Sequence, residues 1–207
     1  MNTTDSADHR RGLRRRGDVL YSAIFQATLQ ELTQVGYARL KMEHVAARAH
    51  ASKRSLYRRW PHRAQLVADA IEHTLPRRGQ PPDTGNVRTD LLDYLRQIAD
   101  ALNSPTGEAI RGLMADTHRD PELTHTIRIR FLDPTISELT TILTRGAARG
   151  EVRPSALTHR IASIAPALLR EHFQTHHAIP DPVLIEIVDD VIIPLIRPVT
   201  AHTKTTQ

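Results

Sequence analysis

The sequence predicts an all-α fold. Apolar residues recur three and four positions apart along most of the 207 residues, which is the spacing of one helix face. Pro and Gly fall between these segments, where helices would end. We find no segment in which apolar and polar residues alternate as they do in a half-buried strand. About 40% of the residues are apolar and 25% are charged, as in a globular protein with a core, and the lack of cysteine excludes disulfides and thiolate ligands.

The chain begins with an expected basic arm and two helices. Residues 1–16 are polar and lack helical periodicity, so we expect them to form a flexible arm. An apolar stripe that begins at Leu20 predicts a long helix, and Gly36 is a favourable residue for its end. A shorter apolar stripe predicts a second helix over residues 42–49.

A third helix follows after a turn of about three residues. Ser52 can cap this helix by accepting from free N–H groups of its first turn, and the helix is expected to continue through Trp60. Pro61 ends it, and a fourth helix is expected to reach about Leu75. Two short helices joined in this way are typical of a helix-turn-helix, whose second helix enters the major groove of DNA.

A linker then separates two expected domains. Residues 76–86 contain three Pro and two Gly, and they divide a DNA-binding domain over 17–75 from a second helical domain over 87–197. The second domain is predicted to contain helices near 87–103, 106–118, 121–131, 135–149, 156–176 and 182–196. Breaks between them are expected at prolines and glycines, among them Asp133-Pro134.

The positive charge is concentrated in the first third of the chain. Residues 1–75 hold 13 Lys and Arg against 7 Asp and Glu, whereas residues 76–207 hold 15 against 16. An excess of positive charge confined to the part with the helix-turn-helix indicates a polyanion as its partner. Lys and Arg on the second helix of the motif can read guanine edges or hold phosphates, and a Tyr hydroxyl can donate to a phosphate oxygen.

The stretch VAARAHASKRSLYRRWPHRAQLV, residues 45–67, resembles the DNA-binding segment of TetR-type repressors. The stretches RDPELTHTIRIRFLDP and RGAARGEVRP resemble one subgroup of the same family. The resemblance implies that Ser52 caps the recognition helix and that Tyr57 contacts a phosphate. Arg63 stands where the family usually has a phosphate-binding Lys. This sequence departs from the pattern at His50 in place of a turn Gly and Ala51 in place of Val.

Lys41 is a further departure, because it stands near a Thr that caps the second helix in the family, and Lys cannot cap by accepting. Leu56 and Trp60 are expected to face the core, and Arg59 is expected to be a solvated charge. The set of predicted DNA-binding residues comprises Lys41, Ser52, Lys53, Arg54, Ser55, Tyr57, Arg58 and Arg63, with Arg14, Arg15 and Arg16 of the arm.

The second domain has more apolar helix faces than a single chain needs to cover, which predicts a ligand pocket. Pro166 lies inside the expected helix over 156–176 and would kink it, opening space against its neighbours. A plain packed core with a structural kink is the alternative. The predicted pocket residues are Leu113, Met114, His118, Phe131, Leu132, Leu139, Leu169, His172 and Phe173, and their apolar character indicates a small apolar effector of unknown identity.

The last two helices also predict a homodimer. The segments 156–176 and 182–196 carry wide apolar stripes, and pairing both with their symmetry mates would form a four-helix interface. A two-fold dimer would bring two recognition helices to the half-sites of a palindromic operator.

The predicted function is therefore a DNA-binding transcriptional regulator, expected to be a repressor that a small apolar effector releases from a palindromic duplex operator. An alternative is a helical metal-binding or adaptor protein that does not bind DNA. His172 and His176, one turn apart, could share a metal only with a third ligand. The sequence has no motif that indicates an enzyme, a cofactor, a metal site or a membrane span, so we expect a cytoplasmic protein without these.

Overall fold

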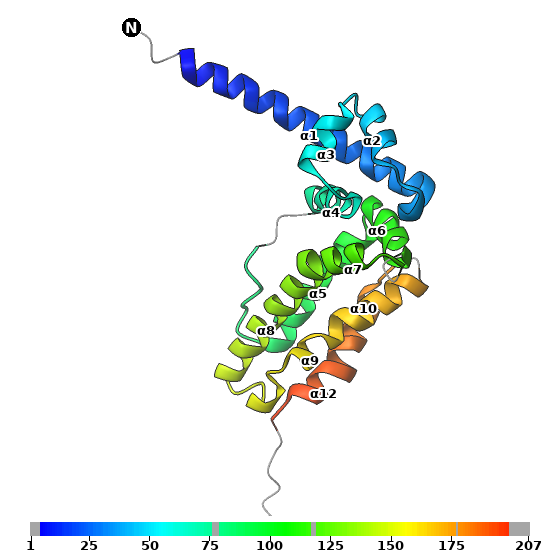
Figure 1. Ribbon diagram of the computed structural model, residues 1–207. Coiled ribbons are helices and arrows are strands. Elements are labelled where there is room, and N and C mark those ends of the chain that lie inside the picture. The colour runs from blue at the N-terminus through cyan, green and yellow to red at the C-terminus, as the bar shows by residue number, and fades with distance from the viewer. Residues whose placement is uncertain (1–4, 76–78, 117–118, 177, 199–207) are drawn as a thin grey trace, which may run out of the picture. The chain divides into compact units, whose positions relative to one another are not determined.

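The computed structural model describes residues 5–75, 79–116, 119–176 and 178–198, of which 5–18, 105 and 116 are described by their backbone alone. These residues form helices and connecting segments without any strand, as the sequence predicted. They divide into two compact units (Figure 1). The first unit comprises Met1–Pro76 with Pro105–Ile127, and the second unit comprises Arg77–Ser104 with Arg128–Gln207.

Helix α1, Asp5–Arg39, opens the first unit. It begins inside the segment that was expected to be an irregular arm, because Arg-rich sequence has good helix propensity and adding residues to an existing helix is easier than starting one. The predicted end at Gly36 is confirmed as an interruption within these bounds, since this residue takes φ 74° and ψ 167°, outside the helical region, and only a short helical turn over residues 37–39 follows it. Only a residue without a Cβ adopts this conformation readily.

The next three helices lie where the sequence predicted them. They are α2 Met42–Arg48, α3 Lys53–Arg59 and α4 Arg63–Thr74. Helices α2 and α4 pack on α1, and α3 packs on α2. Their contacts bury one apolar face of each helix, with Val45 of α2, Leu56 of α3 and Leu66 of α4 all inaccessible to solvent.

Two further helices belong to the first unit, α6 Pro105–Asp116 and α7 Pro121–Ile127. The sequence placed both in the second domain over 87–197, but α6 packs on α1 and α7 packs on α4. Leu113 of α6 and Leu123 of α7 are fully buried. The linker is therefore not the only boundary between the two units, because α6 and α7 follow it in the sequence but pack within the first unit.

The second unit is a set of packed helices in which α5 and α8 run side by side (Figure 1). In chain order its elements are α5 Val87–Asn103, the π-helical η2 Arg128–Leu132, α8 Asp133–Ala148, the 3₁₀ turn η3 Pro154–Ala156, α9 His159–Ala162, α10 Ile164–Thr175, α11 Asp181–Glu186, the π-helical η4 Ile187–Ile192 and α12 Ile193–Ile196.

Both π-helical segments precede a proline. η2 ends two residues before Pro134, and η4 ends two residues before Pro194. In an α-helix the proline ring meets the carbonyl four residues earlier, and in both cases that residue lies inside the wider π turn. The expected break at Asp133-Pro134 is therefore wrong, because the wider turn lets the helix continue past the proline.

The predicted helix over 156–176 is split rather than kinked at Pro166. Its regular part consists of α9 and α10, which meet at Ser163. Pro166 lies in the first turn of α10, where its missing N–H is tolerated, and Ala162 four residues earlier is the last residue of α9. The proline has moved the break three residues toward the N-terminus.

A buried carboxylate fixes the start of the second unit. Asp90 of α5 is fully buried and accepts from the Thr84 backbone N–H at 2.6 Å and from the Arg149 guanidinium at 3.2 Å. Arg145 of α8 donates to the Pro81 carbonyl at 3.1 Å. Residues 79–86, which form no helix, are thereby held against the ends of α5 and α8.

Candidate nucleic-acid interface

The turn between α2 and α3 is built from two local motifs. The N–H of Ala51 donates to the Ala46 carbonyl at 2.9 Å and that of His50 to the Ala47 carbonyl at 3.2 Å, which is the Schellman ending of a helix. His50 takes φ 50° at the position that usually requires Gly. Ser52 then caps α3, as predicted, because its Oγ accepts from the Ser55 N–H at 3.1 Å.

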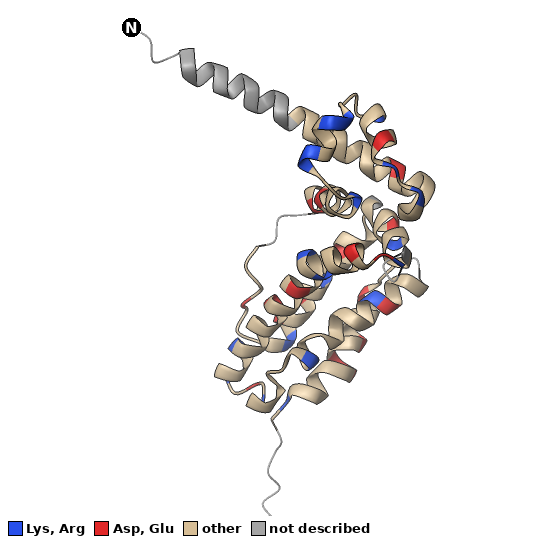
Figure 2. Ribbon diagram, in the orientation of Figure 1, with Lys and Arg blue, Asp and Glu red and all other residues tan. Residues whose placement is uncertain are grey.

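Helix α3 presents a basic outer face. Leu56 and Trp60 are buried, as expected, whereas Tyr57 is 42% exposed. The four cations of the helix are all exposed, and its seven residues include no acid (Figure 2). Lys41, Ser52 and Tyr57 are exposed as well, and Ser55 is half-buried; the exposed cations are Lys53, Arg54, Arg58 and Arg59.

Trp60 anchors the C-terminal end of α3. Its Nε1–H donates to Asp69 Oδ2 at 2.7 Å, and its ring meets the rings of Tyr21 and Phe25 edge-on at 6.0 and 5.8 Å between centroids. Arg59 is turned back toward α1, with its guanidinium carbon 5.3 Å from the Tyr21 ring centroid. Arg59 therefore differs from the other cations of α3 in its surroundings.

A buried carboxylate holds α2 on α1. Glu31 of α1 is almost inaccessible, and its two oxygens accept from His44 Nδ1 at 2.9 Å and from the Arg48 guanidinium at 3.1 Å. Arg48 also donates to the Gln34 side chain at 2.8 Å. Removing one partner of such a buried pair leaves a charge without compensation, so this cluster fixes the position of the helix-turn-helix.

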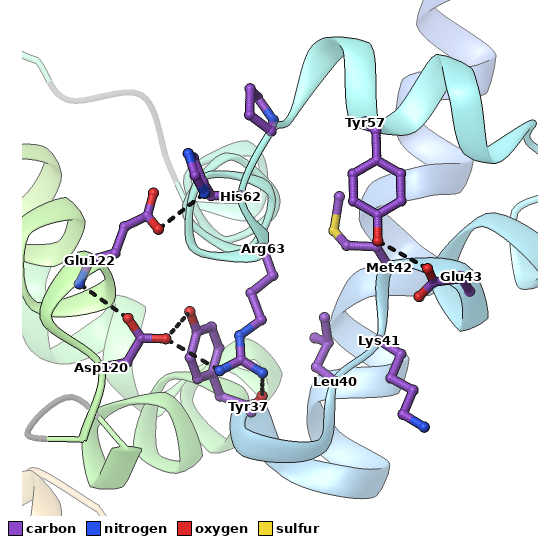
Figure 3. Close-up of a pocket in the computed structure, with 11 residues that line it drawn as sticks. Tyr37, Leu40, Lys41, Met42, Glu43, Tyr57, His62, Arg63, Asp120 and Glu122 are labelled. Atoms are coloured by element: carbon purple, nitrogen blue, oxygen red, sulfur yellow. Dashed lines mark hydrogen bonds and ion pairs between the residues drawn. The ribbon is translucent and has the colours of Figure 1, made fainter.

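A cleft of about 370 Å³ lies beside the motif (Figure 3). It brings together three predicted phosphate contacts, Lys41 before α2, Tyr57 on α3 and Arg63 at the start of α4. Lys41 occupies the N-cap position of α2 without a capping side-chain bond, as expected for a residue that cannot accept. None of the other residues of the cleft was predicted to bind DNA; they are Tyr37, Leu40, Met42, Glu43, Pro61, His62, Asp120 and Glu122.

Tyr57 is held by an acid of the same cleft. Its hydroxyl donates to Glu43 Oε1 of α2 at 3.0 Å. This bond raises the pKa of Tyr57 above its ordinary value. The pKa of Glu43 is lowered by its own backbone N–H and then by Tyr57, which keeps the carboxylate charged. In this pair the Tyr57 hydroxyl donates its proton to a negatively charged oxygen of Glu43.

Arg63 is engaged within the first unit and does not extend freely from α4. Its guanidinium donates to the Tyr37 and Ala38 carbonyls at 3.3 and 3.1 Å and to Asp120 Oδ2 at 3.2 Å, and its carbon lies 4.3 Å from the Tyr37 ring centroid. Burial alone would lower the pKa of Arg63, but hydrogen bonds to Tyr37 and Asp120 raise it. Arg63 is thus bonded to internal acceptors in this structure, and its phosphate contact stays a prediction.

Asp120 and Tyr37 complete this group. The Tyr37 hydroxyl donates to Asp120 Oδ2 at 3.2 Å, and burial raises the pKa of Tyr37 to about 12. Asp120 Oδ1 accepts from the backbone N–H groups of Glu122 and Leu123 at 3.1 and 3.0 Å, which caps α7 ahead of Pro121. The bond from Leu123 is the largest cause that lowers the pKa of Asp120.

The other predicted site residues lie away from this cleft or outside the described residues. The side chains of Arg14, Arg15 and Arg16, and all of His118, lie outside the described residues. The remaining pocket residues divide between the units, with Leu113 and Met114 in the first. In the second unit Leu139, Leu169 and Phe173 are buried and Phe131, Leu132 and His172 half-buried.

The histidines do not gather into a metal site in the described part of the chain. His172 and His176 stack with ring centroids 4.2 Å apart, and His172 Nε2 lies 3.2 Å from the Ala178 carbonyl oxygen. No group of three or more His, Asp or Glu side chains that could hold a metal ion occurs among the described residues. None of the described helices is long and apolar enough to cross a membrane.

The capped turn, the basic face of α3 and the fixed α2 define a helix-turn-helix DNA-binding protein. Residues 24–70 match the family described as bacterial regulatory proteins, tetR family, and residues 81–191 match the Tetracyclin repressor-like C-terminal domain. The chain belongs to the TetR family of transcriptional regulators.

Individual relatives agree with this assignment. A DNA-binding transcriptional repressor TetR of Mycobacteroides abscessus is 35% identical over 187 residues, which cover 88% of this chain and 97% of that protein. The HTH-type transcriptional regulator Rv1556 of Mycobacterium tuberculosis, itself uncharacterized, is 33% identical over 173 residues, covering 83% of this chain and 85% of that one.

Solved structures show the same fold. The crystal structure of the TetR family transcription regulator SCO0332 matches 86% of this chain and 99% of its own with a TM-score of 0.62 and 24% identity. The flavonoid-responsive regulator FrrA matches 87% of this chain and 98% of its own with a TM-score of 0.63 and 17% identity.

As a member of the TetR family, the protein is a DNA-binding transcriptional regulator and not an enzyme, and regulators of this family bind operator DNA as dimers. The alternative of an adaptor that does not bind DNA is set aside.

Proposed function

We propose that the protein is a repressor that binds a palindromic operator through α3 as a homodimer and is released by a small apolar effector. The observation that carries the DNA-binding part is the face of α3, where Ser52 caps the helix and the four cations are exposed while Leu56 and Trp60 are buried. A helix with this division can enter the major groove without losing its contacts to α2.

The exposure of the α3 side chains supports the roles proposed for them. Lys53, Arg54, Ser55 and Arg58 are assigned to base edges and the adjacent backbone, and Tyr57 to a phosphate. Selection of bound sequences from a random DNA pool tests the operator, and the proposal expects a palindromic product. Replacing Lys53 or Arg58 by Ala is expected to weaken operator binding by about 1–3 kcal/mol if the side chain reads a base.

Arg59 offers a matched control for these variants. Arg59→Ala removes the same charge from the same helix, but this side chain faces the Tyr21 ring. We expect Arg59→Ala to change operator affinity less than Arg58→Ala and to leave base preference unchanged. Equal losses for both variants on operator and random DNA would mean that α3 supplies only non-specific charge.

The proposed dimer interface comprises α9–α10 and α11–α12 with η4. Ile185 and Leu195 remain 36% and 38% exposed, and Ile161, Ile164 and Leu168 are half-buried. These apolar side chains support an interface between copies of the chain. Ile185→Glu or Leu195→Glu is expected to give a 23.3 kDa monomer in light scattering. Ile129→Glu, an equally apolar exposed position on η2, should remain dimeric.

The proposed effector site lies among the apolar residues of the second unit named above. Leu139, Leu169 and Phe173 are buried, and the half-buried His172 adds a polar group that could orient a ligand. A thermal-shift screen of apolar and aromatic compounds, with flavonoids as one class of probe, followed by operator-release assays tests the site. Compounds that stabilise the protein but leave operator affinity unchanged at saturation would contradict the release mechanism.

A further inference from the structure

Three side chains of the cleft beside α2 and α3 are paired with carboxylates of the same cleft (Figure 3). Tyr57 donates to Glu43, Arg63 donates to Asp120, and His62 Nδ1 lies 3.1 Å from Glu122 Oε2. A carboxylate and a phosphate diester present the same kind of anionic oxygen to such donors. A phosphate that approaches Tyr57, His62 or Arg63 therefore meets a side chain that already has an anionic partner.

Asp120 differs from Glu43 because it lies outside the helix-turn-helix. It reaches the cleft from the start of α7, where Oδ1 caps the helix and Oδ2 accepts from both Arg63 and Tyr37. One oxygen of the carboxylate thus caps α7, and the other pairs with the Arg63 guanidinium. Arg63 has five N–H groups, and a phosphate that takes the edge now bonded to Asp120 must displace this carboxylate.

We propose that Asp120 competes with an operator phosphate for the Arg63 guanidinium and so lowers the affinity of the repressor for DNA. This inference depends on the operator binding proposed above. In the free protein Arg63 is satisfied by Asp120 and by the two carbonyls at the end of α1. Binding a phosphate at Arg63 requires this pair to open and leaves the Asp120 charge close to the DNA backbone.

The geometry determines what a change at Asp120 does. Asp120→Asn keeps a side-chain oxygen that can cap α7 but removes the charge that faces Arg63. Asp120→Ser also caps a helix, and its shorter side chain withdraws the acceptor from Arg63. In both variants Arg63 gains freedom to contact phosphate, and the repulsion between the carboxylate and DNA disappears.

The experiment measures operator binding by fluorescence anisotropy over a series of salt concentrations. We expect Asp120→Asn and Asp120→Ser to bind operator about five- to tenfold more tightly than the wild type at physiological salt. One additional phosphate contact should steepen the slope of log K against log salt by about 0.9. Glu108→Gln removes an acid of α6 that does not line the cleft, and it should change neither quantity appreciably.

The role of Arg63 is tested by combining substitutions. Arg63→Ala is expected to reduce the salt slope by much less than about 0.9 in the wild type, where the charge is paired, and by the full amount in the Asp120→Asn background. The wild-type half of this comparison needs no substitution at Asp120, so it remains decisive even if that variant fails to fold.

Several outcomes would overturn the inference. The first is unchanged or weaker operator binding by folded Asp120 variants. The second is a gain in operator affinity on substitution of Asp120 that persists in full in the Arg63→Ala background. The third is a reduction of the salt slope by the full value of about 0.9 when Arg63→Ala is made in the wild type. Each of these can occur while the wild-type protein binds its operator specifically. Failure of the wild type to select any operator would instead contradict the proposed function.

Discussion

The Tyr57 hydroxyl of α3 and the Glu43 carboxylate of α2 are joined by a 3.0 Å hydrogen bond on the exposed side of the helix-turn-helix. The two residues lie on the two helices of the motif, so the bond holds the exposed ring in one place. The same bond raises the pKa of Tyr57 further above the neutral range. Because the hydroxyl has a single proton, a phosphate contact at Tyr57 requires this proton to turn from Glu43 to the phosphate.

Tyr57→Phe is expected to weaken operator binding by at most about tenfold, because the variant loses the bond to phosphate but also lacks the Glu43 bond that the phosphate must displace. The slope of affinity against salt should not change, since no cation is removed. Anisotropy titrations at several salt concentrations measure both. Arg58→Ala is the comparison, because it removes a cation assigned to a base edge or the adjacent backbone, and loss of a backbone contact would lower the slope. If Tyr57→Phe changes neither the slope nor the operator affinity, Tyr57 is excluded from the interface.

The helix-turn-helix was predictable from the sequence because its signals are local. Two signals within a short segment specify α3. Ser52 caps the helix by accepting a hydrogen bond from the N–H three residues later, and Pro61 directly follows its end at Trp60. Gly36 likewise marks the end of α1 through its own backbone preference.

The cleft was not predictable, because its bonds join distant parts of the chain. Asp120 before Pro121 is a recognisable helix cap, but its second partner Arg63 lies 57 residues earlier. Burial of the Glu31 and Asp90 carboxylates likewise depends on cations that only the tertiary fold brings near. The π turns before Pro134 and Pro194 were missed because a proline in the sequence indicates a break, whereas packing can preserve the helix through a wider turn.

His50 and Gly150 occupy the same position in two Schellman motifs, with φ 50° and 80°. In both, the next N–H reaches a carbonyl five residues earlier, Ala51 to Ala46 and Glu151 to Gly146, at 2.9 Å. A residue with a Cβ is strained in this conformation by about 1–2 kcal/mol, whereas Gly adopts it readily.

His50→Gly is expected to stabilise the first unit by about 1 kcal/mol, because relief of strain exceeds the greater chain entropy of Gly when unfolded. Denaturant unfolding followed by circular dichroism measures the change. Gly150→Ala introduces the same strain into the second unit and should destabilise it by a similar amount. Destabilisation by His50→Gly would show that the imidazole makes a compensating interaction in the turn.

Gly146 permits a close approach in the second unit. A Cβ at this position of α8 would lie 2.9 Å from Val152 Cγ2 and 3.0 Å from Val87 Cγ2, both on stiff β-branched side chains. Gly146→Ala is therefore expected to destabilise the protein by about 1–3 kcal/mol through overpacking, despite the better helix propensity of Ala.

Gly112 of α6 supplies the control for this substitution. Among the described residues, the space around a Cβ added at Gly112 is open, so Gly112→Ala should stabilise by about 0.5–1 kcal/mol. The double variant Gly146→Ala with Val152→Ala is expected to recover part of the loss, because it removes the closest contact. Equal effects of Ala at both glycines would mean that helix propensity alone decides.

Tyr37 predicts how stability depends on pH in alkali. Burial raises the pKa of Tyr37 from 10.0 to about 12, so the folded protein retains the phenolic proton over a range in which the unfolded chain releases it. The stabilisation is complete below about pH 10 and is lost as pH rises toward 12. Ionisation would also place a phenolate 3.2 Å from Asp120, where the hydroxyl now donates.

Tyr37→Phe removes this titration and should flatten the decline in the free energy of unfolding between pH 10 and 12 relative to the wild type. It also removes the donor to Asp120, so a moderate loss of stability at neutral pH is expected. Urea unfolding at a series of pH values, together with the difference in tyrosinate absorbance between the two proteins, measures both effects. An identical alkaline decline in Tyr37→Phe would assign it to other groups and contradict the buried, protonated Tyr37 hydroxyl as its source.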